Sequence, residues 1–298
     1  MHKDRIKDII ERHLPAPGVL ETALGGVRLF RVTEPLPCVP AVYEPTVVAI
    51  VGGSKEAVVD GRRHLYDHSR YLVCPMTLPV EAGTPEASPE RPLRGVAVSL
   101  DPQMMRDLVI ELEAAGGRAS GSGDRNAPVP ALALAPWEPR FAQALSRFLE
   151  LLDDPVDARI LGPGRRRELC LAVLRGAAGA TARRAFGVGN AIARTIDHLA
   201  AHLNEAITVD DLADLAGMSR AVFHRRFKEA TGMSPIQFVK TMRLSSAAMK
   251  IAAGKTVNAA AWEVGYASPS QFSRDFRRMY GQPPKAWSRS ARVPAGVP

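Results

Sequence analysis

The chain has 298 residues, which is room for two domains of ordinary size, each with its own core. Apolar residues make up 46% and charged residues 23%, and no run approaches the ~20 apolar residues that a membrane-spanning helix needs, which excludes a helical membrane protein. The first residues mix charges of both signs and lack the apolar core of a signal peptide, so we expect a cytoplasmic protein.

The net charge of +8 is unevenly distributed along the chain. Residues 184–298 contain 16 Lys and Arg against 8 Asp and Glu, whereas residues 1–183 contain 23 of each kind and are neutral. A basic domain joined to a neutral one indicates that the second half binds a polyanion and that the first half does something else. An ordinary solvated basic surface is the alternative.

The three cysteines, Cys38, Cys74 and Cys170, are odd in number and far apart in the sequence. This fits neither a disulfide framework nor a Cys-x-x-Cys metal site. We therefore expect buried or incidental thiols, with a redox-sensing thiol as the alternative, and we predict no cofactor.

Short strands separated by turns are predicted between residues 26 and 100. They fall at residues 27–32, 47–51, 57–59, 71–73 and 94–100. Asp60-Gly61 is a strong hairpin pair, whereas Gly52-Gly53-Ser54-Lys55 is too short for a phosphate-binding loop and predicts a second hairpin turn. Many short strands at this spacing predict a small β-sandwich or barrel.

Helices are predicted after residue 100. Asp101 is placed to cap a helix that begins at Pro102, and two further amphipathic segments cover residues 137–152 and 165–174. These helices could supply a dimer interface or cover the β core, and the sequence leaves both open.

Two stretches in this part of the chain lack an apolar period. Residues 116–130 are rich in Gly, Ser and Pro and predict a mobile loop. Residues 177–190 are rich in Ala, Gly, Thr and Arg, so we place a linker at 184–190 between a first domain at 1–183 and a second at 191–290.

From residue 191 onward, every segment has helical periodicity. An apolar stripe in 191–203 predicts a first helix, and Thr208 opens a short second one through a capping box. Gly217 permits a tight turn into a third helix, on which Phe223 and Phe227 face inward. The outer face of that helix is basic, as a helix that enters the major groove of DNA requires.

The same pattern recurs 48 residues later, where Gly265 takes the place of Gly217. The two helix-turn-helix units cover about 208–229 and 256–279, and an internal repeat is much stronger evidence than one motif. Between them, residues 234–254 form one uninterrupted amphipathic run. About 20 helical residues extend roughly 30 Å, close to the ~34 Å pitch of DNA, so this rod could hold two recognition helices in successive major grooves.

Small, aromatic and basic residues stand at fixed spacing in both copies. They are Ala213, Gly217, Ser219, Phe223, Phe227, Lys228, Gly232, Arg243, Leu244, Val264, Gly265, Tyr266, Ser268, Phe272, Ser273, Arg274, Phe276, Arg277, Gly281 and Pro284. With them, residues 191–290 resemble the DNA-binding domain of the AraC/XylS-type transcriptional regulators. Two departures, Ala260 in place of a larger aliphatic residue and Pro283 in place of Ser, do not alter the assignment.

The first half resembles, more loosely, the N-terminal domain of a branch of these regulators. The segments that carry this likeness are residues 42–45, 71–73, 78–80 and 86–92. The resemblance implies a two-domain α+β chain, with a cupin-like β-sandwich or barrel and its appended helices first. An all-α domain with two helix-turn-helix units joined by a long helix follows.

The resemblance also implies which residues meet DNA. The base-facing positions fall on Ala221, His224, Arg225, Pro269, Ser270, Gln271, Ser273 and Arg274, and the phosphate contacts on Lys228, Arg277 and Arg278. We expect sequence discrimination from His224, Arg225, Gln271 and Arg274, because Ala221 and Pro269 have no side-chain donor. For Arg274, an internal ion pair with Glu263 is a serious alternative.

Little in the first domain points to catalysis or metal binding. His64 and His68 are spaced Hx3H, which does not converge on an alternating strand, and no nucleophile elbow is present. We predict no enzyme but a regulator that binds promoter DNA as a homodimer under a small-molecule effector, and that contacts RNA polymerase if it is an activator. The alternative is an enzyme, such as an alkyl-transfer domain, fused to the same DNA-binding domain.

Overall fold

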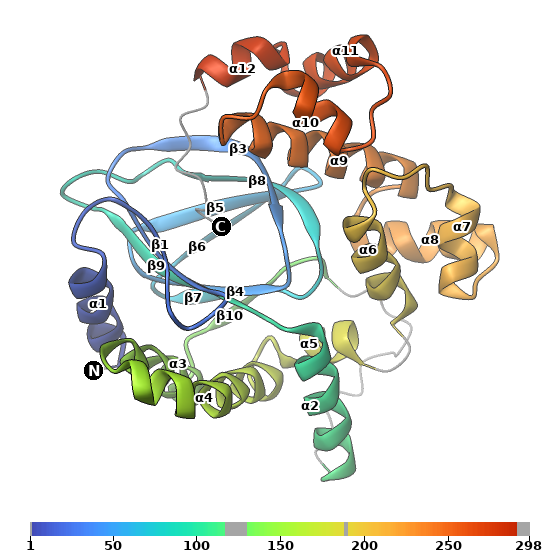
Figure 1. Cartoon of the computed structure of the whole chain (residues 1–298). Helices are drawn as coiled ribbons and strands as arrows, with labels where there is room; N and C mark the ends of the chain where they lie inside the picture. The colour runs from blue at the N-terminus through green and yellow to red at the C-terminus, as the bar shows by residue number, and fades with distance from the viewer. Residues whose placement is uncertain (1, 117–129, 188–189, 291–298) are drawn as a thin grey trace.

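The computed structural model describes residues 2–116, 130–187 and 190–290. Figure 1 shows a sheet-rich first half followed by an all-helical second half. This confirms the predicted α+β architecture. Within the described ranges, the helices are all too short or too polar to cross a membrane.

Two antiparallel sheets form the first half. The six-stranded sheet has the order β1-β2-β9-β4-β7-β10, and the four-stranded sheet has the order β3-β8-β5-β6. In that order, the first sheet consists of Gly18–Glu21, Val27–Val32, Leu93–Ser99, Thr46–Gly52, Arg70–Cys74 and Ala133–Pro136. The second consists of Leu36–Tyr43, Leu78–Thr84, Ser54–Val59 and Arg62–Asp67.

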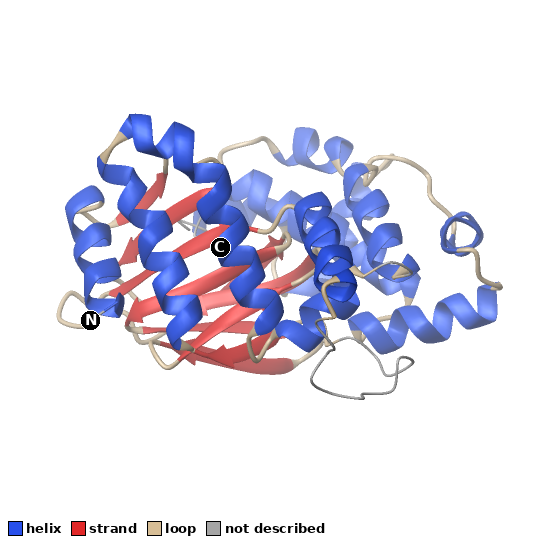
Figure 2. Cartoon of the chain, turned by 90° about the horizontal axis from the view of Figure 1, so that it is seen from below, coloured by secondary structure: helices blue, strands red, loops and turns tan. Residues whose placement is uncertain are grey.

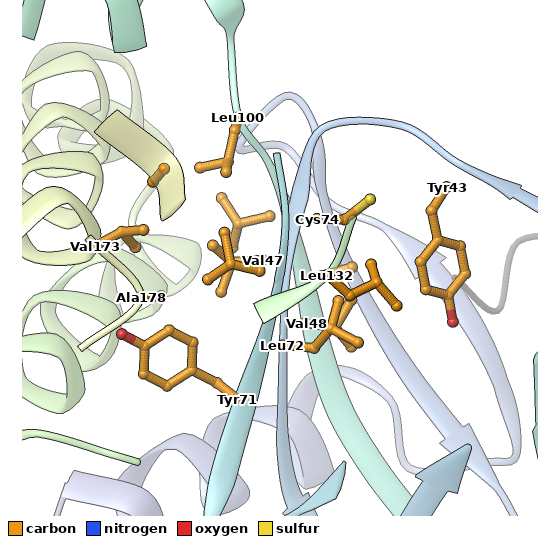
Figure 3. Packing of buried hydrophobic residues seen from close by; sticks show 14 of the residues in the cluster. Tyr43, Val47, Val48, Tyr71, Leu72, Cys74, Leu100, Leu132, Val173 and Ala178 are labelled. Atoms are coloured by element: carbon orange, nitrogen blue, oxygen red, sulfur yellow. The ribbon is translucent and has the colours of Figure 1, made fainter. Parts of the chain in front are cut away.

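Side chains alternate between the two faces of the six-stranded sheet. Figure 3 shows Val48, Leu72 and Cys74 pointing toward Tyr43 of the other sheet, whereas Val47 and Tyr71 point toward the helices. One apolar layer therefore lies between the sheets and another between sheet and helices. This is why the central strands are apolar on both faces.

Helices cover the outer face of the six-stranded sheet (Figure 2). They include α1 (His2–His13), α3 (Pro139–Glu150) and α4 (Pro155–Arg175), with the 3₁₀ turn Leu151–Asp153 between the last two. Tyr71 of β7 stacks on Phe141 of α3 with ring centroids 3.8 Å apart. The helices thus take at least one of their two predicted roles, that of covering the β core.

The predicted helix after residue 100 is present as α2 (Pro102–Ala114), and the Asp101 side chain accepts a hydrogen bond from the backbone of Met104. The region predicted as a linker is partly helical, because α5 (Gly179–Phe186) buries Ala182 and Phe186. Most of the loop predicted at 116–130 lies outside the described residues.

The predicted hairpin turn at Gly52 to Lys55 is wrong. Strand β4 pairs with β7 and β9, whereas β5 pairs with β6 and β8, so the chain passes here from one sheet to the other. Gly53 turns this corner with φ of 74°, and a Cβ on it would lie 2.8 Å from the Cα of Leu93. A glycine pair marks a turn, but it does not say whether the flanking strands pair with each other.

Strands β1 and β10 lie outside the predicted β region of residues 26–100. Both are four-residue edge strands, and each pairs on one side only. Their pairing with β2 and β7 depends on the sheet already formed, which local periodicity does not reveal.

The second half consists of short helices arranged around one longer helix. Its elements are α6 (Ala191–Ala201), α7 (Val209–Ala216), α8 (Arg220–Thr231), α9 (Pro235–Ala252), α10 (Val257–Glu263), α11 (Pro269–Tyr280) and α12 (Pro284–Ser290). Figure 1 shows α9 joining the group α6 to α8 to the group α10 to α12. The core of the first group is continuous with the core of the β-rich half, whereas α10 to α12 and the end of α9 form a separate one.

The helical half rests on the four-stranded sheet through α9, which packs against β3 and β8. The backbone N–H of Val42 donates to the Sδ of Met249 over 3.2 Å. At the tip of the β5–β6 hairpin, Asp60 approaches the end of α8 so closely that a Cβ on Gly232 would lie 2.6 Å from its carboxylate.

Candidate nucleic-acid interface

The first helix-turn-helix unit is shaped by local sequence. Thr208 and Asp211 form the capping box expected at the start of α7, since each side chain accepts a hydrogen bond from the other residue's backbone N–H. The Thr208 hydroxyl also donates to the Asp211 carboxylate over 2.7 Å, and this bond, together with the one from the Thr208 N–H, lowers the pKa of Asp211. Gly217 ends α7 in a left-handed conformation, with φ of 64°, and so makes the tight turn into α8.

Helix α8 is anchored by Phe223 and Phe227, both fully buried. The ring of Phe227 meets that of Phe238 on α9 edge-on, with centroids 5.1 Å apart. The face away from this core is exposed and carries the predicted DNA-contacting residues Ala221, His224, Arg225 and Lys228. Their exposure meets the requirement for contact with DNA, and their individual roles stay predictions.

The second unit repeats this construction. The Ser268 side chain caps α11 by accepting a hydrogen bond from the backbone of Gln271, and Phe272 and Phe276 are fully buried. The outer face exposes Pro269, Ser270, Gln271, Arg274, Arg277 and Arg278. Ser273 is half-buried and therefore less accessible to a ligand than the other predicted positions.

The alternative role predicted for Arg274, an ion pair with Glu263, is not found. The Glu263 carboxylate instead accepts hydrogen bonds from Lys250 and Lys255, each 2.5 Å long, and these lower its pKa to about 2. Among the residues that the structure describes, none forms an ion pair with Arg274. Its guanidinium is therefore available to a ligand.

Polar contacts that sequence reasoning missed fix the second unit, and the segment that precedes the first unit, to α9. Lys240 of α9 lies 2.6 Å from Asp275 of α11, and that carboxylate also accepts a hydrogen bond from the hydroxyl of Tyr266. Between α6 and α7, the carbonyl oxygens of Leu203 and Glu205 accept hydrogen bonds from Arg243 of α9. The sequence feature that could have indicated these contacts is the presence of charged residues on a helix that is packed along its length, because partly buried charges need partners.

A second group of polar residues lies between the two sheets. Lys55 and Thr84 are each 1% exposed, and Thr84 Oγ1 has no hydrogen-bond partner among the described residues. The hydroxyls of Tyr43 and Tyr66 lie 3.4 Å apart. We call Lys55, Thr84, Tyr43 and Tyr66 the inner polar cluster.

Desolvation governs the protonation of this cluster. Burial lowers the pKa of Lys55 to about 7, because an ammonium is poorly solvated between the sheets. Burial raises the pKa of both tyrosines, so they stay neutral hydrogen-bonding groups. Lys55 lies in a segment that was predicted as a turn, although Lys55, Ala57 and Val59 alternate along the chain as residues on one face of a strand do.

The three cysteines fit the expectation of buried or incidental thiols. Burial raises the pKa of Cys74 to about 12 and that of Cys170 to about 11. Cys38 is only half-buried, and burial raises its pKa as well. None of the three is set up as a reactive thiolate.

A cleft of about 140 Å³ lies where α2, α5 and α6 meet. Arg106, Arg194 and Asp197 line it together with apolar side chains, and burial raises the pKa of Asp197. The cleft adjoins the region predicted as the interdomain linker.

Comparison with known proteins agrees with both halves of the chain. The family described as the AraC-type transcriptional regulator N-terminus matches residues 23–181, and a helix-turn-helix domain family matches residues 212–290. An AraC-like transcription regulator of Streptomyces lividans is 36% identical over 88 residues, and an HTH-type transcriptional regulator of Haemophilus influenzae is 41% identical over 86 residues. Each alignment covers under a third of this chain, at 29% and 28%, and 29% of the relative.

The fold of nearly the whole chain is similar to that of a solved protein. The structure of unsaturated fatty acid bound wild-type ToxT from Vibrio cholerae matches with a TM-score of 0.55 and 12% sequence identity. The match covers 92% of this chain and 95% of ToxT.

Proposed function

This chain belongs to the AraC-type transcriptional regulators, DNA-binding proteins with a helix-turn-helix domain, and from that premise we propose how it reads and controls its DNA site. Helices α8 and α11 enter two successive major-groove segments on one side of the duplex. A small-molecule effector bound by the first domain, residues 1–183, controls how the second domain, residues 191–290, presents them.

The observation that carries this proposal is the repeated construction of α7–α8 and α10–α11 on one connecting helix. In each unit two buried phenylalanines fix a helix whose outer face is exposed and basic. The connecting helix α9 has 18 residues and so extends about 27 Å, which is close to the ~34 Å pitch of DNA.

The exposed residues divide by chemistry into two proposed roles. Arg and His donors and the Gln amide suit base edges, so we assign sequence discrimination to His224, Arg225, Gln271 and Arg274. Small neighbours of these residues allow close approach of the helix to the bases: Ala221, Pro269, Ser270 and Ser273. Lys228, Arg277 and Arg278 lie further along each helix, and we assign them to phosphates, which adds affinity without sequence information.

Arg225→Ala and Arg274→Ala test the base-reading assignment. Each variant is expected to weaken binding to a promoter site by ~1–3 kcal/mol, since a well-aligned arginine–guanine contact contributes that much. Thermal stability should stay within about 1 kcal/mol, because both side chains are exposed and form no ion pair with a described residue. Fluorescence anisotropy with a labelled operator and an unrelated duplex measures both affinities.

Two comparison variants separate base reading from general charge loss. Lys228→Ala should weaken binding to operator and unrelated DNA alike, whereas Arg140→Ala, at an exposed residue of α3, should change neither. Unchanged operator affinity in both Arg225→Ala and Arg274→Ala would refute the site assignment.

Control by an effector is supported by the contact between the two halves. Helix α9, which carries both helix-turn-helix units, packs directly on β3 and β8. A ligand that shifts these strands would act on the one element that sets the spacing of the two recognition helices. ToxT, whose fold this chain shares, is known with a fatty acid bound, which supports a small-molecule effector.

The cysteines favour a regulator over an alkyl-transfer enzyme. That chemistry needs a thiolate, and the pKa of each of Cys38, Cys74 and Cys170 is raised by burial. The relatives, which are transcription regulators, point the same way.

The first turns of α4 support the predicted homodimer. Val156 and Ile160, one helical turn apart, are 64% and 68% exposed, which is unusual for large apolar side chains so close together. Ile160→Glu is therefore expected to shift a dimer to monomers, whereas Leu65→Glu, at an apolar residue 56% exposed on β6, should not. Analytical ultracentrifugation distinguishes the two results, and a dimer that survives Ile160→Glu places the interface elsewhere.

A further inference from the structure

The register of the sheets aims the inner polar cluster into the space between them. On the four-stranded sheet, Lys55 of β5 lies opposite Tyr66 of β6. Glu56 lies opposite Gly83 of β8, which puts Lys55 beside Thr84. Lys55 shares a strand face with Ala57 and Val59, and all three are buried.

A second cation faces the same space from the six-stranded sheet. Arg28 pairs with Ala97, and Ala97 pairs with Val48, whose side chain points between the sheets in Figure 3. Arg28 is partly exposed, and its Nε lies 3.7 Å from the Glu21 carboxylate at the outer edge of the sheet. Its charge helps to lower the pKa of Lys55, so the two cations act on each other.

No acid balances Lys55 within the described residues. Glu56 is its neighbour in sequence, but its carboxylate is on the other face of β5 and accepts two hydrogen bonds from Arg63, one of them 2.6 Å long. None of the hydrogen bonds and ion pairs among the described residues involves the Lys55 ammonium, and the residue is 1% exposed. A buried charge without a partner is costly, as is the unsatisfied hydroxyl of Thr84.

We propose that the inner polar cluster binds the carboxylate of an organic monoacid, with Lys55 as its counter-ion and Thr84 as a hydrogen-bond donor. One ammonium beside one hydroxyl matches a group with one negative charge and two acceptor oxygens. Apart from Arg28, the side chains beside the cluster are mostly apolar, including Ala57, Val59 and Val80, so the body of the acid is apolar as well.

This proposal rests on the proposed function, because the acid would act as the effector. Thr84 lies on β8, one of the two strands that carry α9. A carboxylate bound between β5 and β8 would therefore act on β8, one of the two strands on which the DNA-binding half rests.

The test compares acids with their own amides on the full-length chain. Benzoate, hexanoate, octanoate and decanoate are titrated by calorimetry beside the matching primary amides, which keep the shape and lose the charge. At least one acid is expected to bind about tenfold or more tightly than its amide, as a charge-assisted contact predicts. Lys55→Met should bring acid and amide within about twofold, and Thr84→Val should weaken the acid more than the amide.

Proton uptake gives a second readout. At pH 8, Lys55 is mostly neutral, and an acid that pairs with it should draw in up to one proton, seen by calorimetry in buffers of different ionisation enthalpy. The other titratable groups between the sheets, Tyr43, Tyr66 and Cys74, have raised pKa values and stay protonated. Cys38 lies with Glu56 on the other face of the sheet, and burial raises its pKa as well. Uptake should vanish in Lys55→Met and persist in the exposed control Lys7→Met.

Two results overturn the proposal. One is that every acid binds the unmodified chain no more tightly than its amide does, or that none of these compounds binds at all. The other is a preference for the acid that survives in Lys55→Met. Effector control is tested separately, by measuring operator affinity with and without the bound acid. If an acid binds through Lys55 but leaves operator affinity unchanged, effector control is refuted and the binding site is not.

Discussion

Lys55→Met is expected to make the chain more stable. The methionine has nearly the length of the lysine stem, and it removes a charge on a side chain that is 1% exposed and has no partner among the described residues. Because burial lowers the pKa of Lys55 from 10.5 to about 7, the charged lysine costs on the order of 3–5 kcal/mol of folding free energy at low pH.

The gain depends on pH in a defined direction. Below pH 7 the lysine is protonated in both states and the full cost is present. Between pH 7 and 10.5 the unfolded chain binds more protons than the folded one, so the stability of the unmodified chain rises with pH. The difference between Lys55→Met and the unmodified chain should shrink by roughly 3 kcal/mol from pH 6 to pH 9.5.

Urea unfolding of both chains at the two pH values measures this difference. Other groups titrate in the same range, but their contributions are common to both chains and cancel. Lys7→Met, at an exposed lysine on α1, should differ from the unmodified chain by less than about 0.5 kcal/mol at either pH. A Lys55→Met chain that is less stable at pH 6 would show that the ammonium has a stabilising partner.

Phe276→Ala is expected to cost about 3–5 kcal/mol and to act on the second helix-turn-helix unit alone. The ring is fully buried and touches the rings of Phe272, Tyr280 and Trp287, with centroids 5.4, 4.7 and 5.9 Å away. These residues belong to a small core that is separate from the larger one shared by the β-rich half and the first unit. Loss of its central ring should therefore unfold this part first.

Hydrogen exchange locates the effect. Backbone amides of α10 to α12, residues 257–290, should exchange faster in Phe276→Ala, while those of β4, β7 and β9 should be unchanged. Met279→Ala, at a side chain 37% exposed on the same helix, should have little effect. Faster exchange throughout the chain would mean that the two cores unfold together.

The helical half was largely predictable from sequence because its signals are local. A cap, a left-handed glycine and a pair of phenylalanines four residues apart each act within one or two turns of helix, so Thr208, Gly217 and Gly265 mark real boundaries. The contacts of Lys240 with Asp275 and of Lys250 with Glu263 escaped prediction, since they join helices whose packing no local pattern specifies.

The β-rich half was predictable only in outline. Alternation located the central strands, but partners in a sheet come from distant segments, and Gly53 could mark a hairpin or a corner with equal local justification. In the structure, strand β5 begins at Ser54, directly after Gly53 at the corner. Lys55 therefore lies on a strand with its side chain in the interior, and not in a turn as predicted.

By itself, the sequence determined the class of this protein, the basic second half and the repeat that places two helices with exposed basic faces on one rod. These follow from composition and from spacings of three or four residues along a helix. Only the tertiary structure decided that Glu263 pairs with lysines in place of Arg274, that α9 rests on the four-stranded sheet and that Lys55 is buried with no acid beside it in the described part of the chain. Each of these depends on which side chains distant in sequence meet, and the packing of the whole chain sets that.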